Sequence, residues 1–169
     1  MQPDGFVAAA HVHPAQSERF TVVDGTLELR VGSETVRAQA GDEFVVAPGM
    51  PHRFSNPGPG EARFLCEIRP ALQFESLIET MFTLAAEGKT RKHGLPGPLR
   101  LAVVAQAHFD TVRLPFPPAR LQRAALAIGA PVGRALGYKA TVDRSPSRAG
   151  LERTYDRGRP HTSRPRRAT

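Results

Sequence analysis

The sequence contains a single cysteine, Cys66, and no tryptophan, and no apolar run approaches the roughly 20 residues of a membrane-spanning helix. One cysteine excludes an internal disulfide and indicates a reducing compartment. The N-terminus has no basic segment ahead of an apolar core, so it does not resemble a secretory signal. We therefore expect a cytoplasmic protein that does not associate with membranes.

Positive charge is present but unevenly distributed. The chain of 169 residues has a formal net charge of +7, and residues 144–169 contain eight arginines against Glu152 and Asp156. This segment has few large apolar residues, so it cannot bury enough surface to offset the entropy lost on ordering. We expect residues 141–169 to form a disordered, solvated basic tail. Contact of the tail with RNA, DNA or an acidic membrane surface is the alternative that we favour less.

Residues 5–69 have the pattern of short strands separated by turns. In TLELRV (26–31), apolar residues alternate with polar ones, as in a strand with one buried side. Turn signals recur at Asp24-Gly25, Gly32-Ser33 and Gly41-Asp42. Six or seven short strands with such turns indicate an antiparallel β-barrel or sandwich.

Residues 71–140 change to helical spacing. Apolar residues recur every three or four positions in 71–88, and Gly88 predicts the end of that helix. Residues 99–110 and 117–138 are further candidate helices, and the last should break or kink near Gly129–Pro131. We predict three parts: a barrel at 1–70, a helical extension at 71–140 and the tail at 141–169. The helices are expected to pack on the barrel or to mediate dimer contact.

Four polar residues are predicted to face the barrel interior. His11 and His13 lie one residue apart on a predicted strand, so their side chains share a face. Glu18 has the parity of apolar residues on the next strand, and His52 lies on a later strand. Buried ionisable groups need a partner or a metal. A divalent cation accepts both neutral imidazole nitrogen and carboxylate oxygen, so the pattern favours a metal site.

The spacing of these residues resembles the two motifs of the cupin superfamily. The first motif is matched by Gly5, His11, His13, Glu18 and Gly25, and the second by Gly41, Gly49, His52 and Asn56. One departure is Ala47, where the family usually has a proline, although Pro48 stands beside it. The segment between the motifs, 26–40, is short, as is common in bacterial cupins. The resemblance covers roughly residues 5–69.

The resemblance implies a small jelly-roll β-barrel holding one divalent transition metal through His11, His13, Glu18 and His52. Fe, Mn, Ni, Co, Cu and Zn all suit this mixed set of nitrogen and oxygen ligands. Cupins include dioxygenases, isomerases, decarboxylases, lyases and regulatory or storage proteins, so the fold alone does not fix the activity.

We expect a metal-dependent enzyme of the dioxygenase type that acts on a small organic molecule. Glu18 would then be a catalytic residue as well as a ligand, because a carboxylate can also shuttle a proton. The alternative is a non-catalytic binding or sensing module with a structural or vestigial metal site.

The start of the barrel raises a question of completeness. Cupin barrels commonly have one or two strands before the first motif, but only four residues precede Gly5. Either the barrel is small, or a partner subunit covers its edge, or the assigned start is too late. Because an uncovered edge strand is a pairing hazard, we expect a homodimer formed through this edge or through the helices.

The sequence also predicts a role or an orientation for four further residues. Asn56 either orients the loop of His52 or forms the turn before a proline. Cys66 is expected to be a buried strand thiol and not a nucleophile. Strand parity places Arg19 and Arg53 outward, so we expect them to face solvent.

Overall fold

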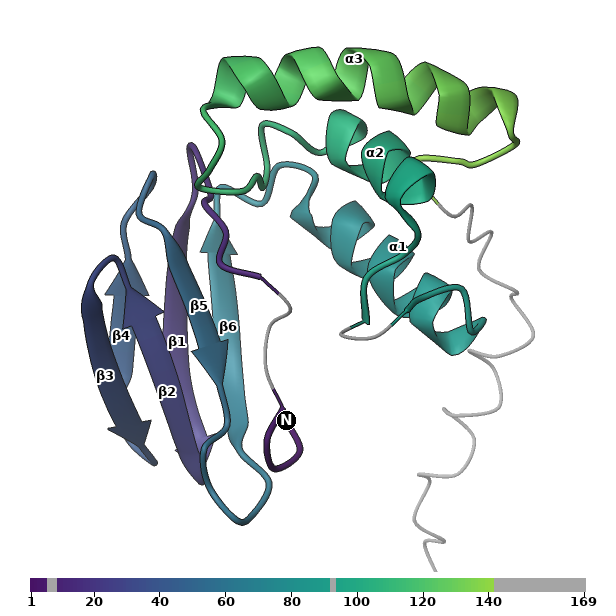
Figure 1. Cartoon of the computed structure of the whole chain (residues 1–169). Helices are drawn as coiled ribbons and strands as arrows, with labels where there is room; N and C mark the ends of the chain where they lie inside the picture. The colour runs from purple at the N-terminus through teal and green to yellow at the C-terminus, as the bar shows by residue number, and fades with distance from the viewer. Residues whose placement is uncertain (6–8, 92–93, 142–169) are drawn as a thin grey trace, which may run out of the picture.

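The computed structural model describes residues 1–5, 9–91 and 94–141, so the predicted tail lies outside the described residues beyond position 141. In the described part, six strands come first and three helices follow (Figure 1). The strands are β1 (Ser17–Asp24), β2 (Thr26–Val31), β3 (Glu34–Gln39), β4 (Glu43–Val46), β5 (His52–Ser55) and β6 (Arg63–Arg69). The helices are α1 (Phe74–Ala86), α2 (Pro98–Ala107) and α3 (Ala119–Ala135). The predicted class, a small antiparallel jelly-roll barrel followed by helices, is confirmed.

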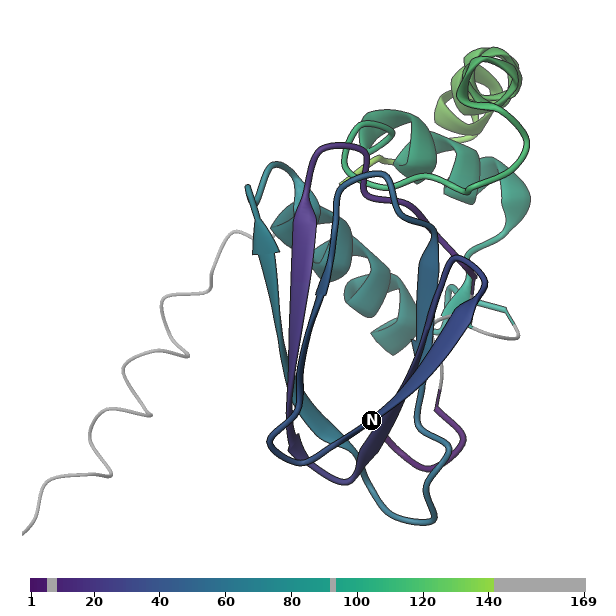
Figure 2. The same ribbon diagram turned by 90° about the vertical axis from the view of Figure 1, so that its left-hand side faces the viewer.

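The strands form two three-stranded antiparallel sheets, in the orders β4-β1-β6 and β3-β2-β5. Figure 2 shows the two sheets face to face, with α1 behind the opening between them. The core lies between the sheets, and three phenylalanine rings meet there. Phe20 packs edge-on against Phe54 with ring centres 5.0 Å apart, and Phe64 lies 5.5 Å from Phe54. The remaining buried core residues are Val22, Leu27, Leu29, Ala38 and Val46.

The alternation seen in the sequence decides which side chains enter this core. In β2, Leu27 and Leu29 are buried while Arg30 is exposed, as the period of two predicts. The turn between β1 and β2 requires its glycine. Gly25 has φ +76°, and a Cβ there would lie 2.7 Å from the Glu61 carbonyl oxygen.

Helix α1 ends where the sequence predicts. Gly88 adopts φ +66°, and its N–H donates to the Ala85 carbonyl at 3.0 Å. The N–H of Lys89 donates to the Leu84 carbonyl at 2.8 Å. These two bonds satisfy carbonyls that the end of a helix otherwise leaves unpaired, so glycine closes the helix here.

A break or a kink was predicted near Gly129–Pro131 in the last helix; the break is wrong, and the kink stays a prediction. α3 runs without interruption from Ala119 to Ala135, with Pro131 inside it. Proline removes the hydrogen bond to the carbonyl four residues earlier, which here belongs to Ala127. Both residues are exposed, so water can hydrogen-bond to the carbonyl of Ala127.

None of the described helices is long and apolar enough to span a membrane.

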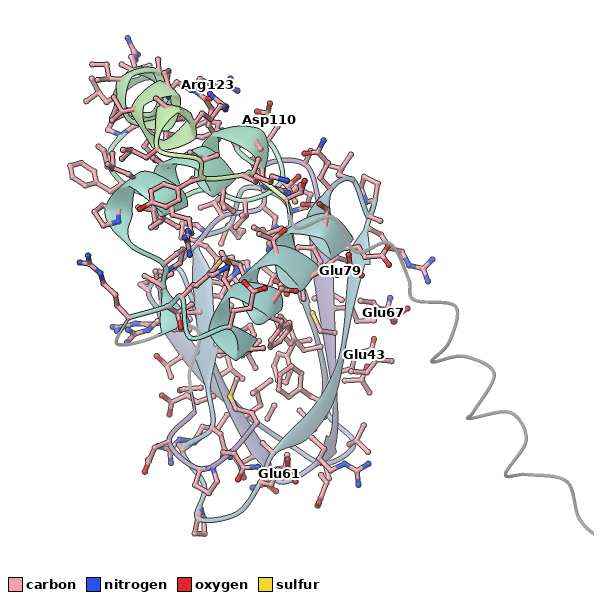
Figure 3. All side chains as sticks on the ribbon, turned by 90° about the vertical axis from the view of Figure 1, so that its right-hand side faces the viewer. Glu43, Glu61, Glu67, Glu79, Asp110 and Arg123 are labelled. Carbon is pink, nitrogen blue, oxygen red and sulfur yellow. The ribbon has the colours of Figure 1, made fainter. Side chains whose placement is uncertain are left out.

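Helices α2 and α3 pack closely against each other. A Cβ at Gly133 would lie 2.6 Å from the Leu99 carbonyl oxygen and 2.6 Å from the Val103 side chain, so only glycine allows this approach. At the other end, Arg123 of α3 donates to Asp110 at 2.6 Å (Figure 3). The helices fall within 71–140 as expected, but the division of the chain into three parts stays a prediction.

Candidate metal centre

Two short backbone ladders hold the segment that carries His11 and His13. The N–H groups of His11 and His52 each donate to the other's carbonyl at 2.9 Å. Val12 pairs in the same way with Arg113, with bonds of 2.8 and 3.0 Å. The segment is therefore fixed between the start of β5 and a stretch that follows α2. In place of a full strand, the described part of this segment has only these bridges.

The four predicted ligands come together. Glu18 points inward from β1, and His52 points inward from the first position of β5 in the opposite sheet. Glu18, His13 and His52 are each 2% exposed, and His11 is partly exposed. One ligand atom from each of the four lies within 4.8 Å of the others. The fold thus unites residues from both motifs in one buried cluster.

Backbone carbonyls define which nitrogen of each imidazole is free. The Nδ1 atoms of His11, His13 and His52 lie 3.2, 2.8 and 3.0 Å from the carbonyls of Ala9, Thr111 and Met50, respectively. A carbonyl only accepts, so each Nδ1 carries the hydrogen and donates it. In the neutral form each Nε2 then presents a lone pair, which is the form in which histidine binds a metal.

The lone pairs of His13 and His52 face the same carboxylate oxygen. His52 Nε2 lies 2.6 Å from Glu18 Oε2, and His13 Nε2 lies 3.6 Å from the same atom. His13 Nε2 is also buried without any hydrogen-bond partner. Three acceptors this close, with one wholly unpartnered, need a proton or a cation between them. The residues present therefore fit a divalent metal bound by nitrogen and oxygen.

Protonation in the absence of a metal follows from the same contacts. Burial alone would raise the pKa of Glu18, but hydrogen bonds from His52 and Cys66, with the attraction of the imidazoles, hold it below its ordinary value. Burial alone would lower the pKa of His52, but the Glu18 and Met50 contacts outweigh it and raise the pKa. The pair therefore forms a buried ion pair, with the proton on His52 Nε2.

The pKa of His11 shifts in the opposite direction to the pKa of His52. Burial, followed by repulsion from His52, lowers the pKa of His11 to about 4. Its Nε2 therefore keeps its lone pair through the physiological range of pH. A neutral imidazole is the form that binds a metal, so His11 needs to lose no proton.

Glu18 is the only buried carboxylate in residues 1–5, 9–91 and 94–141. Acidic residues on the same sheet point away from the interior, as Figure 3 shows for Glu43 and Glu67. Glu43 pairs with Arg19 at 2.7 Å on that outer surface. No second carboxylate of the described chain accompanies Glu18 in the cluster.

Two residues that contact the cluster, Thr111 and Gln16, were not found from the sequence, and the contact of Cys66 with Glu18 was not predicted. Thr111 supplies the carbonyl for His13, although 98 residues separate them. Gln16 is 1% exposed and places its Oε1 3.3 Å from the same imidazole nitrogen. The Cys66 thiol donates to Glu18 Oε1 at 3.0 Å. Strand parity would have found Cys66, but no local signal links Thr111 to the site.

The contacts also test the predictions made for Asn56 and Cys66. Asn56 donates to the carbonyls of Met1 and Gly60 and accepts from the N–H of Gly58 at 3.0 Å, so it forms the turn after β5. Cys66 is partly buried on β6, and burial followed by the Glu18 charge raises its pKa, so it is a neutral thiol.

Two arginines face each other outside the barrel. Arg30 of β2 is directly opposite Arg53 of β5, and both are exposed, like Arg19. They border a surface depression of about 320 Å³, whose lining is completed by Ala10, Gly32, Pro51, His52 and Pro115. The outward orientation predicted for Arg19 and Arg53 is confirmed, so these side chains point away from the ligand cluster.

A comparison with known families decides the assignment of the barrel. The family model described as "Cupin domain" matches residues 1–67, which include all four clustered residues. These residues form a cupin domain. The match ends before α1, so the helices lie outside the cupin part of the chain.

Two curated relatives resemble this cupin domain. Polyketide synthase CurC of Streptomyces cyaneus is 36% identical over 67 residues, which are 40% of this chain and 44% of the relative. Tetracenomycin polyketide synthase protein TcmJ of Streptomyces glaucescens is 33% identical over 60 residues, 36% of this chain and 40% of the relative. The chain thus spans less than half the length of either relative.

A solved structure is also similar to the chain. It is an uncharacterized conserved protein with a double-stranded β-helix domain from Klebsiella pneumoniae, 30% identical. The match covers 42% of this chain and 62% of that chain, with a TM-score of 0.40.

Proposed function

We propose that His11, His13, Glu18 and His52 bind one divalent transition metal, and that the protein is a metal-dependent enzyme of the oxygenase type. The observation that carries the proposal is the buried, unpartnered Nε2 of His13, 3.6 Å from Glu18 Oε2. Leaving such an atom unpaired costs about 1–3 kcal/mol, which a bound metal would recover. Fe, Mn, Ni, Co, Cu and Zn all suit three imidazole nitrogens and one carboxylate oxygen.

A metal at this position supplies Lewis-acid or redox chemistry. The chain's own residues supply orientation and proton control. Carbonyls at the three Nδ1 atoms hold the imidazoles in place, and the Cys66 thiol holds Glu18 through Oε1. We also propose that Glu18, as well as being a ligand, shuttles a proton to or from a substrate, because a carboxylate can take up and release a proton. Phe20, two residues after Glu18 on β1, is buried in the core between the sheets.

We propose a small organic molecule as the substrate. Both curated relatives are named as polyketide synthase proteins, which makes polyketide-type compounds the first class to screen. The similarity is limited to the cupin domain, and the screen should therefore also include unrelated small organic acids and phenols.

The test is the metal content of protein purified without chelator or affinity tag. We expect about one equivalent of a transition metal in the wild type and loss of that metal in the His11→Ala/His13→Ala variant. Arg19→Ala/Glu43→Ala is the matched control, because it removes two side chains that pair on the outer surface of the barrel, outside the cluster. Wild-type protein that holds no metal, even after reconstitution, would overturn the proposal.

A non-catalytic binding or sensing module is the second candidate. It is favoured by the absence of a second buried carboxylate beside Glu18 among the described residues, since mechanisms that use a pair of carboxylates need one. Oxygen consumption by the metal-loaded protein across the substrate screen separates the two. Turnover supports the enzyme, whereas ligand binding without turnover supports the module.

Partners and location follow as further proposals. We propose a homodimer, supported by exposed apolar side chains along α3 and at its C-cap, namely Leu121, Ile128, Val132 and Leu136. Light scattering during size-exclusion chromatography tests this, and a monomer at micromolar concentration would contradict it. The single thiol supports a reducing compartment such as the cytoplasm.

A further inference from the structure

The helical extension reaches the metal centre at His13. The Thr111 carbonyl lies 2.8 Å from His13 Nδ1. The ring of Phe74, the first residue of α1, packs edge-on against the same imidazole with 5.6 Å between ring centres. Both residues lie outside the matched cupin region, which ends at residue 67. The cupin domain therefore does not supply all the surroundings of His13.

The position of Thr111 is held from two directions. Its N–H donates to the His108 carbonyl at 2.9 Å in the turn that follows α2. Two residues later, Arg113 exchanges both backbone hydrogen bonds with Val12. Val12 immediately precedes His13, so this ladder sets the distance between the Thr111 carbonyl and the imidazole.

Gln16 makes a second connection between His13 and the extension. Its Oε1 lies 3.3 Å from His13 Nδ1, and its Nε2 donates to the carbonyls of Pro70 and Ala71 at 2.8 and 2.9 Å. Those carbonyls lie just before α1. The buried amide thus joins the imidazole to the start of the helical part.

These contacts decide the tautomer of His13. The Thr111 carbonyl and Gln16 Oε1 are both acceptors, so the hydrogen lies on Nδ1 and the lone pair on Nε2 faces Glu18. The other tautomer would place a lone pair against two oxygens and an N–H where the metal ligand is needed. Loss of such an orienting contact typically lowers metal affinity about 10- to 100-fold.

We propose that the helical extension contributes to the metal centre. The Thr111 carbonyl and the Gln16 amide, which connects to the extension, are positioning groups for His13. The expected effect of these contacts on metal affinity rests on the proposed metal site. Their expected effect on the tautomer of His13 does not, because it can be measured in the metal-free protein. The extension is then neither a separate unit nor only a dimer contact, because it selects the nitrogen that His13 presents.

The first measurement is the His13 tautomer in full-length protein stripped of metal. Long-range ¹⁵N–¹H correlation spectra at a pH where imidazoles are neutral distinguish a hydrogen on Nδ1 from one on Nε2. We expect the Nδ1–H form in the wild type. A wild-type spectrum showing the Nε2–H form would overturn the inference, whatever the metal content.

The second measurement uses a matched pair of variants at Arg113. Arg113→Pro removes the N–H that donates to the Val12 carbonyl, whereas Arg113→Ala keeps it and removes the same side chain. We expect Arg113→Pro to mix the two tautomers and to weaken Co²⁺ binding about tenfold or more. Arg113→Ala should keep the wild-type tautomer and bind Co²⁺ within about twofold of the wild type, since its backbone contacts are unchanged.

A second variant covers the case in which Arg113→Pro fails to fold. Gln16→Met keeps the length of the side chain but removes the contact to Nδ1 and the two bonds to the extension. We expect the same direction of change in tautomer and Co²⁺ affinity. Wild-type behaviour of both variants would overturn the inference while leaving the metal site intact. Failure of the wild type to bind Co²⁺ would overturn the proposed function alone, because the tautomer is read without metal.

Discussion

Glu18 Oε2 and His52 Nε2 lie 2.6 Å apart in the protein interior, although 34 residues separate them and they belong to opposite sheets. The Nδ1 of His52 donates to the Met50 carbonyl, so its other nitrogen meets the carboxylate. Only a proton or a cation makes that contact favourable. The pair is thus a proton-holding site in the metal-free protein and half of the proposed ligand set.

The Glu18→Gln variant tests this pair directly. It preserves the size of the side chain but replaces a charged oxygen donor by a weaker neutral one. We expect metal affinity to fall by at least one to two orders of magnitude, measured by competition with a chromogenic chelator. Glu43→Gln removes an exposed carboxylate from the same sheet, paired only with Arg19, and should change affinity little. Equal effects of the two changes would contradict the role of Glu18.

Metal affinity should depend on pH through His52. Its pKa is raised, chiefly by the hydrogen bond to Glu18 acting against burial, and the metal must displace the proton from Nε2. Affinity should therefore increase as pH rises through that pKa and level off above it.

Calorimetry of metal binding in two buffers of different ionisation enthalpy measures the protons released. Below the raised pKa of His52 we expect about one proton per metal. In Glu18→Gln the levelling should move to lower pH, because the contact that raises the pKa of His52 is weakened. An affinity that is independent of pH would contradict the assignment of the proton to His52.

Cys66 is expected to stabilise the protein through its hydrogen bond to Glu18. The thiol donates to Oε1 at 3.0 Å, and burial raises its pKa, so it stays a donor at neutral pH. Cys66→Ala leaves a buried charged oxygen with one partner fewer, and we expect a loss of about 1–3 kcal/mol in the free energy of unfolding. Cys66→Ser retains a donor and should lose less. Urea denaturation of the metal-free proteins gives both values, and a serine variant no better than alanine would refute the donor role.

His11 should make the metal-free protein sensitive to mild acid. Its pKa is lowered to about 4 from 6.5, mainly by burial, so between these values the unfolded chain binds a proton that the folded chain does not. The free energy of unfolding should therefore fall as pH decreases from 6.5 towards 4. Urea denaturation of His11→Asn across this range should show a shallower slope than the wild type. An unchanged slope would assign the acid sensitivity elsewhere.

His52 contributes to stability with the opposite sign. Its folded pKa lies above 6.5, so its contribution is complete below that pH and is lost as pH rises through the folded pKa. The two histidines together predict a stability maximum near pH 6.5 for the metal-free protein, which the same titration checks. The Glu18→Gln variant should lose the decline on the alkaline side.

Local pattern in the sequence determined the ligand cluster and the class of fold. Alternation along TLELRV decided which residues of β2 are buried, since successive side chains of a strand point to opposite faces. The same period of two placed His11 with His13, and Glu18 with Phe20, on inner faces. Gly88 ended α1 because its missing Cβ permits a positive φ. These features depend on neighbours in the chain, so they can be predicted from the order of residues.

Only the tertiary structure decided what surrounds the cluster. Thr111 and Gln16 select the tautomer of His13, and the Cys66 thiol reaches Glu18, through contacts between segments distant in sequence. The uninterrupted course of α3 through Pro131 likewise depends on a carbonyl that faces solvent. Packing and solvent exposure determine such contacts, and no local period encodes them. The sequence therefore predicted which four side chains meet in the cluster, while the fold determined how each imidazole is oriented.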